Sequence, residues 1–572
     1  MTNLHSLISP QQDSSPEPSN VGDLISLFLE ANGVESAFGV ISIHNMPILD
    51  AFARRGNIRF VPSRGEAGAV NMADSYARVS NGLSVALTST GTAAGNAAGA
   101  MVEALTAGSP VLHITGQIEA EHIDKNRAYI HESPAQLDML KAVSKSAYRI
   151  NRPEDTIAVL QQAVTDALTF PRGPVSVEIP IDVQQAPIEL INKNELLPLN
   201  LELISAKKDD ITAVATALKQ AKRPMIMLGG GAKHAQKAAR ALADMGIGIV
   251  TSTNGRAVVE EDHPMSLGAF NVSTYIQDLY ASVDFMIVVG SRLRSNETWT
   301  YKLKLPDNLT IVDCDQLADQ RCYPNKQFVH ADSKLFLEAL VEEVKGSLDI
   351  DSGFAADLAQ VRETSIAELR DAIGPYAEIV DALQEAMPVN SCWVRDVTIS
   401  NSMWGNRLLK IGHPQAGVHA MGGGIGQGLP MAIGASIASD EQVIALSGDG
   451  GLSLCMGELM TAAEEEANFT MLLMNDKGYG VIRNIQDAVY GGRRHYSDIL
   501  VPQFDKLAEA TGIKHFYVDS VATFRTALKQ AMAESGPKIL EIDMIAIGPF
   551  TKPFAGPPTK TASSSNQVDE VR

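Results

Sequence analysis

Residues 443–451 read VIALSGDGG, and residues 470–480 read TMLLMNDKGYG. Each is a short apolar run that ends in glycine and acidic residues, a pattern typical of a buried strand followed by a turn. A helical stretch separates the two runs, which therefore predict one strand–helix–strand unit of a parallel sheet. Because the carboxyl ends of such strands lie at one edge of the sheet, we expect Asp449 and Asp476, 27 positions apart, to lie close together.

The residues around the two aspartates indicate the chemistry of this edge. Gly448, Gly450 and Gly451 surround Asp449, and glycine lets backbone N–H groups approach an anion at the start of a helix. Two carboxylates with the backbone carbonyl of Gly478 suit Mg²⁺, which takes oxygen ligands and shares them with phosphates. Each motif alone is typical of an ordinary turn, but their joint spacing favours a site for a metal and a diphosphate.

Similar β-rich apolar runs alternate with helical patterns along the whole chain of 572 residues. This alternation predicts α/β domains, each built on a doubly wound parallel sheet. Polar stretches at 188–207 and 346–375 divide the chain into three such domains, and both ends are rich in Ser and Pro. The predicted parts are a disordered tail at 1–20, α/β domains at 21–187, 205–345 and 372–555, and a disordered tail at 556–572.

The amino-acid composition limits the classes of partner that the protein could bind and the cellular compartments in which it is expected. The formal net charge of -20 repels phosphate backbones and anionic lipid surfaces, so neither nucleic acid nor a membrane is an expected partner. The four cysteines form no CxxC pair, which favours reduced thiols. The first twenty residues lack the pattern of a signal peptide. We therefore expect a cytoplasmic protein.

The motifs GDGG and NDKGYG, together with GGGIGQGLP at 422–430, resemble the diphosphate domain of thiamine-diphosphate-dependent enzymes. The resemblance is to the group that holds acetolactate synthase, benzoylformate decarboxylase and pyruvate decarboxylase. It covers about residues 21–550 and implies pyrimidine-binding, central and diphosphate-binding domains, in that order. The resemblance also implies that Asp449, Asp476 and the Gly478 carbonyl hold Mg²⁺, although the family usually has asparagine where this chain has Asp476.

The resemblance implies further cofactor contacts. The segment FVPSRGEAGAVNMADSYAR at 60–78 is similar to the family segment with one essential glutamate, which maps onto Glu66. In the family this carboxyl promotes the imino tautomer of the aminopyrimidine, which deprotonates C2 to give an ylid and later an enamine. Ile425 takes the place of the family's apolar wedge beneath the cofactor. The implied cofactor-binding residues are Glu66, Thr398, Ser400, Gly424, Ile425, Gly448, Gly450, Gly451, Asp476 and Tyr479.

Two histidines are candidates at the substrate end. His44 lies where benzaldehyde lyase has its own histidine, and His131 aligns with the substrate-channel segment of the family, with Glu132 and Gln136 nearby. Histidine transfers protons near neutral pH, so both are candidate catalytic residues, although each could equally be a hydrogen-bonded loop histidine. Ser89 begins the segment STG, where benzoylformate decarboxylase has a catalytic histidine instead.

The central block contains LGGGA at 228–232 after an apolar run, which resembles a dinucleotide-binding loop. No acidic residue ends the next predicted strand, GIGIVTS at 246–252, where a ribose ligand would be expected. Acetolactate synthases hold FAD in this domain and oxalyl-CoA decarboxylase holds ADP, whereas other members hold nothing. We expect no FAD here.

The resemblance implies a thiamine-diphosphate- and Mg²⁺-dependent decarboxylase or carboligase acting on a 2-oxo acid or aldehyde. Benzoylformate decarboxylase has a second histidine in the region that corresponds to GAFNVSTY at 268–275, where this chain has none. The absence of both histidines favours carboligation or C–C lyase chemistry. A 2-hydroxyacyl-CoA lyase or oxalyl-CoA decarboxylase-like enzyme is an alternative. A non-catalytic family-like subunit is another, against which Glu66, Asp449 and Asp476 argue. Family sites lie between two subunits, which implies a homodimer or a homotetramer.

Overall fold

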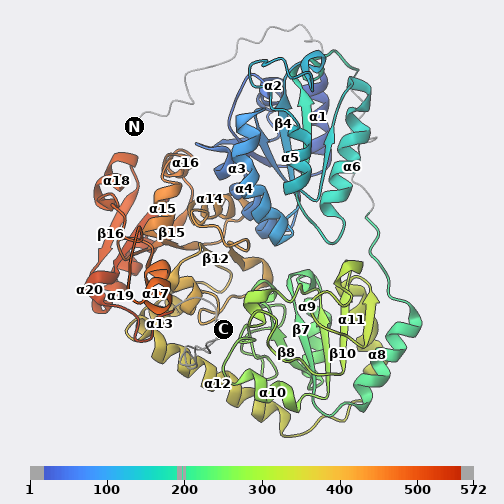
Figure 1. The fold of residues 1–572 in the computed structure, drawn as a ribbon, viewed down its shortest axis with the longest axis vertical. Coiled ribbons are helices and arrows are strands. Elements are labelled where there is room, and N and C mark those ends of the chain that lie inside the picture. The colour runs from blue at the N-terminus through green and yellow to red at the C-terminus, as the bar shows by residue number, and fades with distance from the viewer. Residues whose placement is uncertain (1–18, 190–195, 197–200, 555–572) are drawn as a thin grey trace, which may run out of the picture.

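The computed structural model describes residues 19–189, 196 and 201–554, which form three α/β units with one parallel sheet each (Figure 1). The prediction of three parallel-sheet α/β domains is confirmed. The predicted tails at 1–20 and 556–572 lie outside the described residues, apart from Ser19 and Asn20. Those two residues belong to the first unit, because Asn20 and Asp23 form a capping box at the start of the first helix.

The first domain holds a six-stranded sheet in the order β2-β1-β3-β4-β6-β5. Most of its strands are short runs of buried apolar residues, as expected for a sheet covered by helices on both faces. The strands are β1 (Ser36–Gly39), β2 (Arg59–Pro62), β3 (Ser84–Thr88), β4 (Val111–Gln117), β5 (Ser146–Arg149) and β6 (Val175–Pro180). The helices are α1 (Val21–Ala31), α2 (Met46–Arg55), α3 (Glu66–Ser80), α4 (Thr92–Ala107), α5 (Gln136–Val143), α6 (Thr156–Leu168) and α7 (Ile181–Gln185).

The central domain holds a five-stranded sheet in the order β11-β10-β9-β7-β8. The chain runs outward from β7 in one direction to β8 and in the other to β9, so the strand order reverses between β7 and β9. Open α/β sheets bind ligands at the carboxyl side of such a point. The strands are β7 (Pro224–Leu228), β8 (Gly248–Thr251), β9 (Phe285–Val289), β10 (Leu309–Asp313) and β11 (Gln327–His330), and the helices are α8 (Lys208–Gln220), α9 (Gln236–Asp244), α10 (Ile276–Ser282) and α11 (Ser333–Val344).

The third domain holds a six-stranded sheet in the order β13-β12-β14-β15-β17-β16. Helix α12 (Phe354–Ile373) leads into it: Phe354 packs in the central core and Ile373 in the core of the third domain. The strands are β12 (Cys392–Arg395), β13 (Gly417–His419), β14 (Val443–Gly448), β15 (Phe469–Asn475), β16 (Lys514–Val518) and β17 (Lys538–Asp543). The helices are α13 (Tyr376–Ala386), α14 (Gly428–Ala438), α15 (Asp449–Leu454), α16 (Glu458–Glu464), α17 (Gly480–Val489), α18 (Phe504–Thr511), α19 (Val521–Met532) and α20 (Met544–Ile547).

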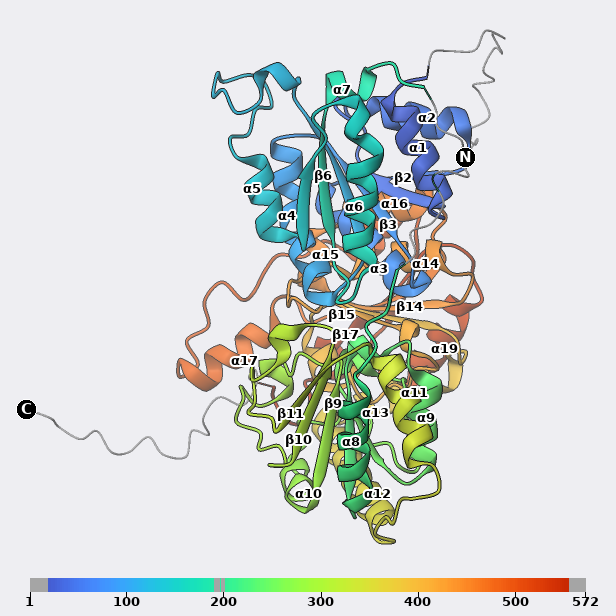
Figure 2. The ribbon, with the colours of Figure 1, turned by 90° about the vertical axis from the view of Figure 1, so that its right-hand side faces the viewer.

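Helices α3 and α14 join the first and third domains, and they lie side by side in both views (Figures 1 and 2). Their backbones approach closely, since a Cβ atom on Gly434 would lie 2.1 Å from the carbonyl oxygen of Met72. Apolar residues of the two domains share one continuous core around this contact. None of the helices formed by the described residues combines the length and the apolar character needed to cross a membrane.

Candidate functional site

Asp449 and Asp476 follow neighbouring strands of the third sheet. Strands β14 and β15 are paired in parallel, with Gly448 opposite Met474, so both aspartates lie at the same carboxyl edge. The backbone N–H of Gly478 donates to Oδ2 of Asp449 at 2.8 Å. The structure therefore brings the two motifs together in one site.

The electrostatics of this pair fit a bound cation. Burial raises the pKa of Asp449 to about 7, and the neighbouring carboxylate of Asp476 contributes to the rise. Burial also raises the pKa of Asp476, against the effect of the neighbouring Arg483 guanidinium. Two buried carboxyl groups side by side cannot both be charged unless positive charge lies nearby. The described residues contain no group of three or more His, Cys, Asp or Glu side chains that could hold a metal.

The third oxygen available at this site belongs to the backbone. The carbonyl oxygen of Gly478 lies 3.3 Å from the position that a Cβ atom on Gly450 would take. Gly450 also faces the ring of Tyr479, where its Cβ atom would lie only 2.6 Å away. Two carboxylates and one carbonyl suit Mg²⁺, which keeps free positions for phosphate and water.

These groups line a cavity of about 390 Å³ at the edge of the third sheet. The sequence candidates that line it are Thr398, Ile425, Gly448, Asp449, Gly450, Gly451, Asp476, Gly478 and Tyr479. Helix α15 begins at Asp449. The diphosphate expected here would therefore lie against a helix N-terminus and a run of glycines.

Ser400 and Gly424 lie outside the residues that line this cavity. The hydroxyl of Ser400 is buried and has no hydrogen-bond partner among the described residues. The chain forms one turn of π-helix over Asn401–Gly405, and the residue that reaches the cavity is Ser402 instead. Ser400 as a cofactor-binding residue therefore stays a prediction, and Ser402 is a further candidate because it lines the cavity.

Asp396 is a buried residue of this site that the sequence analysis missed. Its Oδ2 accepts from the N–H of Gly426 at 3.1 Å, and its Oδ1 accepts from Val397 at 2.8 Å. Burial raises its pKa to about 6, against the effect of backbone hydrogen bonds that include those from Gln427 and Gly428. Asp396 therefore fixes the glycine-rich turn next to Ile425.

The edge of the first sheet holds the remaining candidates. Glu66 begins α3, and its carboxylate accepts from the side-chain amide of Asn96 at 3.2 Å. The rings of His44 and His131 lie 5.1 Å apart, edge to face, and Nδ1 of His44 lies 3.3 Å from the hydroxyl of Ser89. Burial lowers the pKa of His44, with a further contribution from His131. The structure brings the two histidines together.

Gln136 is held inside the first domain. Its side chain accepts from the N–H of Gly91 at 2.7 Å and donates to Glu178 at 2.9 Å. Glu132 accepts from the N–H of Tyr129 at 3.0 Å. These bonds give Gln136 a structural role beneath the loop that holds His131.

Among the described residues, Glu66, His44 and His131 of the first domain do not line the cavity that holds Asp449. Arg78, near the end of α3, donates to the carbonyl of His419 at 2.7 Å, which lies just before the glycine-rich turn. Glu66 begins the same helix, twelve residues earlier, which corresponds to about 18 Å along the helix axis.

Apolar side chains are exposed beside both edges. Ile43 and Ile130 beside the histidines are 63% and 72% exposed, and Leu454 and Ile482 beside the third-domain cavity are 62% and 46% exposed. Exposed apolar residues gathered at a functional edge mark surfaces that another molecule covers.

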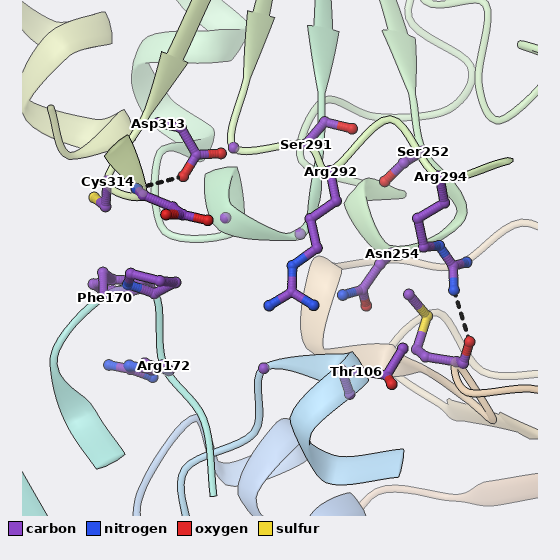
Figure 3. Close-up of a pocket in the computed structure, with 18 of the residues that line it drawn as sticks. Thr106, Phe170, Arg172, Ser252, Asn254, Ser291, Arg292, Arg294, Asp313 and Cys314 are labelled. Carbon is purple, nitrogen blue, oxygen red and sulfur yellow. Dashed lines mark hydrogen bonds between the residues drawn. The ribbon is translucent and has the colours of Figure 1, made fainter. Parts of the chain in front are cut away.

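A second cavity, of about 140 Å³, lies at the carboxyl edge of the central sheet, where the strand order reverses (Figure 3). The glycine turn at its wall is tight, since a Cβ atom on Gly229 would lie 2.1 Å from the carbonyl oxygen of Gly290. Phe170 and Arg172 of the first domain line the opposite side. The cavity therefore lies between the first and central domains.

Charged residues line this second cavity. The side chain of Arg292 points into it and has no hydrogen-bond or ion-pair partner among the residues described (Figure 3). Arg294 instead donates to the carbonyl of Met421 at 2.7 Å. Asp313 ends β10 at this edge, and burial raises its pKa. Asp313 ends the run of β10 and not that of β8, where a ribose ligand was expected, so the dinucleotide pattern did not indicate it.

Comparisons with known proteins agree with this arrangement. The three family models that match describe the N-terminal TPP binding domain, the central domain and the C-terminal TPP binding domain of thiamine pyrophosphate enzymes, at residues 19–139, 211–340 and 399–542. Thiamine pyrophosphate, or TPP, is another name for thiamine diphosphate.

Several curated proteins are similar over nearly the whole chain. A probable 2-ketoarginine decarboxylase of Pseudomonas aeruginosa is 28% identical, over 91% of this chain and 93% of that protein. The large subunit of acetolactate synthase isozyme 1 of Escherichia coli is 26% identical, over 91% and 93%. A probable acetolactate synthase large subunit of Methanocaldococcus jannaschii is 26% identical, over 90% of each chain.

Proposed function

From the premise that the chain belongs to the thiamine pyrophosphate enzyme family, we propose that it is a thiamine-diphosphate- and Mg²⁺-dependent decarboxylase or carboligase of 2-oxo acids. The observation that carries this proposal is the cavity at the carboxyl ends of the paired strands β14 and β15. Asp449, Asp476 and Gly478 all line it, and Gly478 donates to Asp449. The names of two relatives, a probable 2-ketoarginine decarboxylase and an acetolactate synthase, support the reaction class.

The residues present fit the cofactor and its metal. Asp449, Asp476 and the carbonyl of Gly478 would hold Mg²⁺, and the N-terminus of α15 would bind the diphosphate. Ile425, which is 37% exposed at the cavity, would support the rings. When bound, thiamine diphosphate supplies a nucleophilic carbon and a sink for the electrons released with CO₂.

The first domain would supply the proton-handling groups. Glu66 would hold a proton at the aminopyrimidine ring, and Asn96 fixes its carboxylate. His44 has a pKa below its ordinary value because it is buried, so it is neutral at pH 7 and able to accept a proton from the substrate side. His131, whose ring packs against that of His44, orients it.

We propose that two copies of the chain form the site. Glu66 is not among the residues that line the cavity of Asp449, and apolar residues are exposed next to His44 (Ile43) and at that cavity (Ile482). A homodimer, or a homotetramer built from two dimers, would place the first-domain edge of one copy over the third-domain cavity of the other. All four cysteines are free, which supports a reducing, cytoplasmic location.

We propose that the central cavity holds no FAD. Its volume of about 140 Å³ is below the 300–1,000 Å³ typical of sites for larger ligands. The protein purified without added flavin should therefore show no flavin absorbance. Stoichiometric flavin in the purified protein would contradict this.

The test of the function is CO₂ release from a panel of 2-oxo acids, including pyruvate, benzoylformate and a 2-oxo acid with a guanidino group. Thiamine diphosphate and Mg²⁺ are added, and Glu66→Gln is measured beside a control, Glu35→Gln, which changes an exposed carboxylate of the same domain. We expect release that Glu66→Gln abolishes and Glu35→Gln preserves. The aldehyde or acyloin produced distinguishes decarboxylation from carboligation.

The panel also includes acyl-CoA substrates, because one observation favours that alternative. The unpartnered guanidinium of Arg292 in the central cavity would suit a single phosphate group of such a substrate. Cofactor binding without CO₂ release from any free acid would favour C–C lyase or acyl-CoA chemistry. No Mg²⁺-dependent binding of thiamine diphosphate at all would indicate a non-catalytic subunit.

A further inference from the structure

Arg483 of α17 directly contacts the metal-ligand candidate Asp476. Its guanidinium donates to the backbone carbonyl of Asp476 at 2.8 Å, and the same nitrogen lies 2.9 Å from Oδ2 of the Asp476 side chain. The Arg483 and Asp476 side chains are only 15% and 17% exposed. A guanidinium that contacts both the carboxylate and the carbonyl of one residue fixes the orientation of that residue.

The pair also balances charge at the site. Enzymes that this chain resembles usually have a neutral asparagine at the position of Asp476, so the aspartate adds one negative charge beside Asp449. Arg483 adds one positive charge at the same place. The two charges cancel, so the Asp476–Arg483 pair leaves the site with the net charge that an asparagine would give. Without Arg483, Asp476 would add an unpaired charge at a buried position, which is unfavourable.

Arg483 ties two further segments to the same turn. Its second guanidinium nitrogen lies 2.9 Å from Oδ1 of Asp498. Asp498 forms a β-bridge with Gly478, and the N–H of Tyr479 donates to the carbonyl of Ser497 at 2.8 Å. Helix α17 has no buried residue and projects from the molecule in Figure 2. Arg483 therefore attaches the first turn of α17 and residues 497–498 to the metal-ligand turn.

We propose that Arg483 is a positioning residue for the metal, and that Asp476 and Arg483 together replace the neutral asparagine of related enzymes. Arg483 holds Oδ2 of Asp476, which leaves Oδ1 for the cation, and it cancels the added charge. The inference rests on the proposed function, since it requires that Asp476 binds Mg²⁺. If Arg483 only anchored α17, its effect on metal binding would not depend on the charge at position 476.

A double-mutant cycle separates these roles. Asp476→Asn, Arg483→Gln and the double variant are titrated with Mg²⁺ at saturating thiamine diphosphate. The dissociation constant is measured by intrinsic fluorescence, and Mg²⁺-dependent thermal stabilisation is measured in parallel without substrate. Arg494→Gln is the matched control, because its guanidinium pairs with the partly exposed Asp487 in the same region.

We expect Asp476→Asn alone to weaken Mg²⁺ binding at least 10-fold, because it leaves the positive charge of Arg483 beside a dication. The double variant should recover at least 5-fold of this loss, since the positive charge beside the cation is gone. Asp476→Asn combined with Arg483→Lys keeps the positive charge and should not recover. If Arg483→Gln does not fold, Arg483→Met supplies the neutral residue.

Two contrary results have different meanings. A wild-type protein that does not bind Mg²⁺ with thiamine diphosphate would overturn the proposed function, and this inference with it. A wild-type protein that binds Mg²⁺ while the double variant binds no more tightly than Asp476→Asn would overturn the inference alone. Arg483 would then be an anchor of α17.

Discussion

The backbone N–H of Gly478 donates to Oδ2 of Asp449 at 2.8 Å, so the turn after β15 is fixed directly to the turn after β14. Asp449 therefore supports the neighbouring turn and, in the proposed site, would also supply an oxygen to the cation. We expect Asp449→Ala to weaken Mg²⁺ binding at least 100-fold, because it removes a ligand as well as the acceptor of Gly478.

The measurement is the shift in melting temperature that Mg²⁺ produces at saturating thiamine diphosphate. Asp487→Ala, which changes an aspartate of α17 paired with Arg494, is the control and should keep the shift. An Asp449→Ala protein with a wild-type shift would remove Asp449 from the metal site.

Asp396 should be sensitive to a change of one atom. In Asp396→Asn the new NH₂ group would face backbone N–H groups such as those of Gly426 and Val397, so at least one donor loses its acceptor. We expect the free energy of unfolding to fall by about 1–3 kcal/mol and thiamine diphosphate to bind more weakly. Urea unfolding and cofactor titration measure the two effects, with the exposed Asp440→Asn as control. Equal free energies of unfolding for Asp396→Asn and Asp440→Asn would show that the hydrogen bonds of Asp396 do not stabilise the fold.

The contact between α3 and α14 leaves no room at Gly434. A Cβ atom there would lie 2.1 Å from the carbonyl oxygen of Met72 and 2.3 Å from Oγ of Ser75. Gly434→Ala should therefore separate the helices and reduce the free energy of unfolding by about 1–3 kcal/mol. Chemical unfolding beside Ser436→Ala, a change on the same helix, tests this. A Gly434→Ala protein with the wild-type free energy of unfolding would show that the interface between α3 and α14 adjusts to the added methyl group.

His113 should make the first domain sensitive to acid. It is fully buried between Thr88 and Ser176, and burial lowers its pKa from 6.5 to about 4. As the pH falls below 6.5, the histidine of the unfolded chain is protonated while the buried ring of the folded chain stays neutral. Protonation therefore favours the unfolded state, and the free energy of unfolding decreases from about pH 6.5 towards pH 4. The loss amounts to about 3 kcal/mol.

The variant His113→Asn should lack this part of the pH dependence. Urea unfolding of both proteins at a series of pH values from 7 to 4 measures the difference. The wild-type curve should fall more steeply than that of the variant, and parallel curves would contradict the effect assigned to burial.

The proximity of Asp449 and Asp476 could be predicted from the sequence, because each residue follows a predicted strand of the same parallel sheet. Their runs are short, apolar and separated by one helix, so the topology alone placed them at one edge. The same pattern was present for Asp396, which directly follows the buried run CWVR, and Asn20 and Asp23 carried the signal of a capping box. These residues were predictable from the sequence.

Other features depended on geometry that spacing does not determine. Ser402 lines the cavity from within a turn of π-helix, which the sequence does not reveal. His44 and His131 meet through a loop in which His131 has a φ of 67°, a conformation that is uncommon for residues other than glycine and that spacing does not predict. The contact of Arg483 with Asp476 depends on the direction in which α17 leaves the sheet. Loops and helix directions thus determined the features that the sequence did not reveal.

The most direct test of the central claim, a thiamine-diphosphate site shared between two copies, is subunit complementation. Chains with Glu66→Gln and chains with Asp449→Ala, each with a different affinity tag, are co-expressed, and the mixed dimer is purified through both tags. In the mixed dimer one site pairs an intact Glu66 with an intact Asp449, so CO₂ release should recover to about half of the wild-type value, while each parent dimer stays inactive. A mixed dimer as inactive as its parents would show that the two residues act within one chain, and would contradict the shared site.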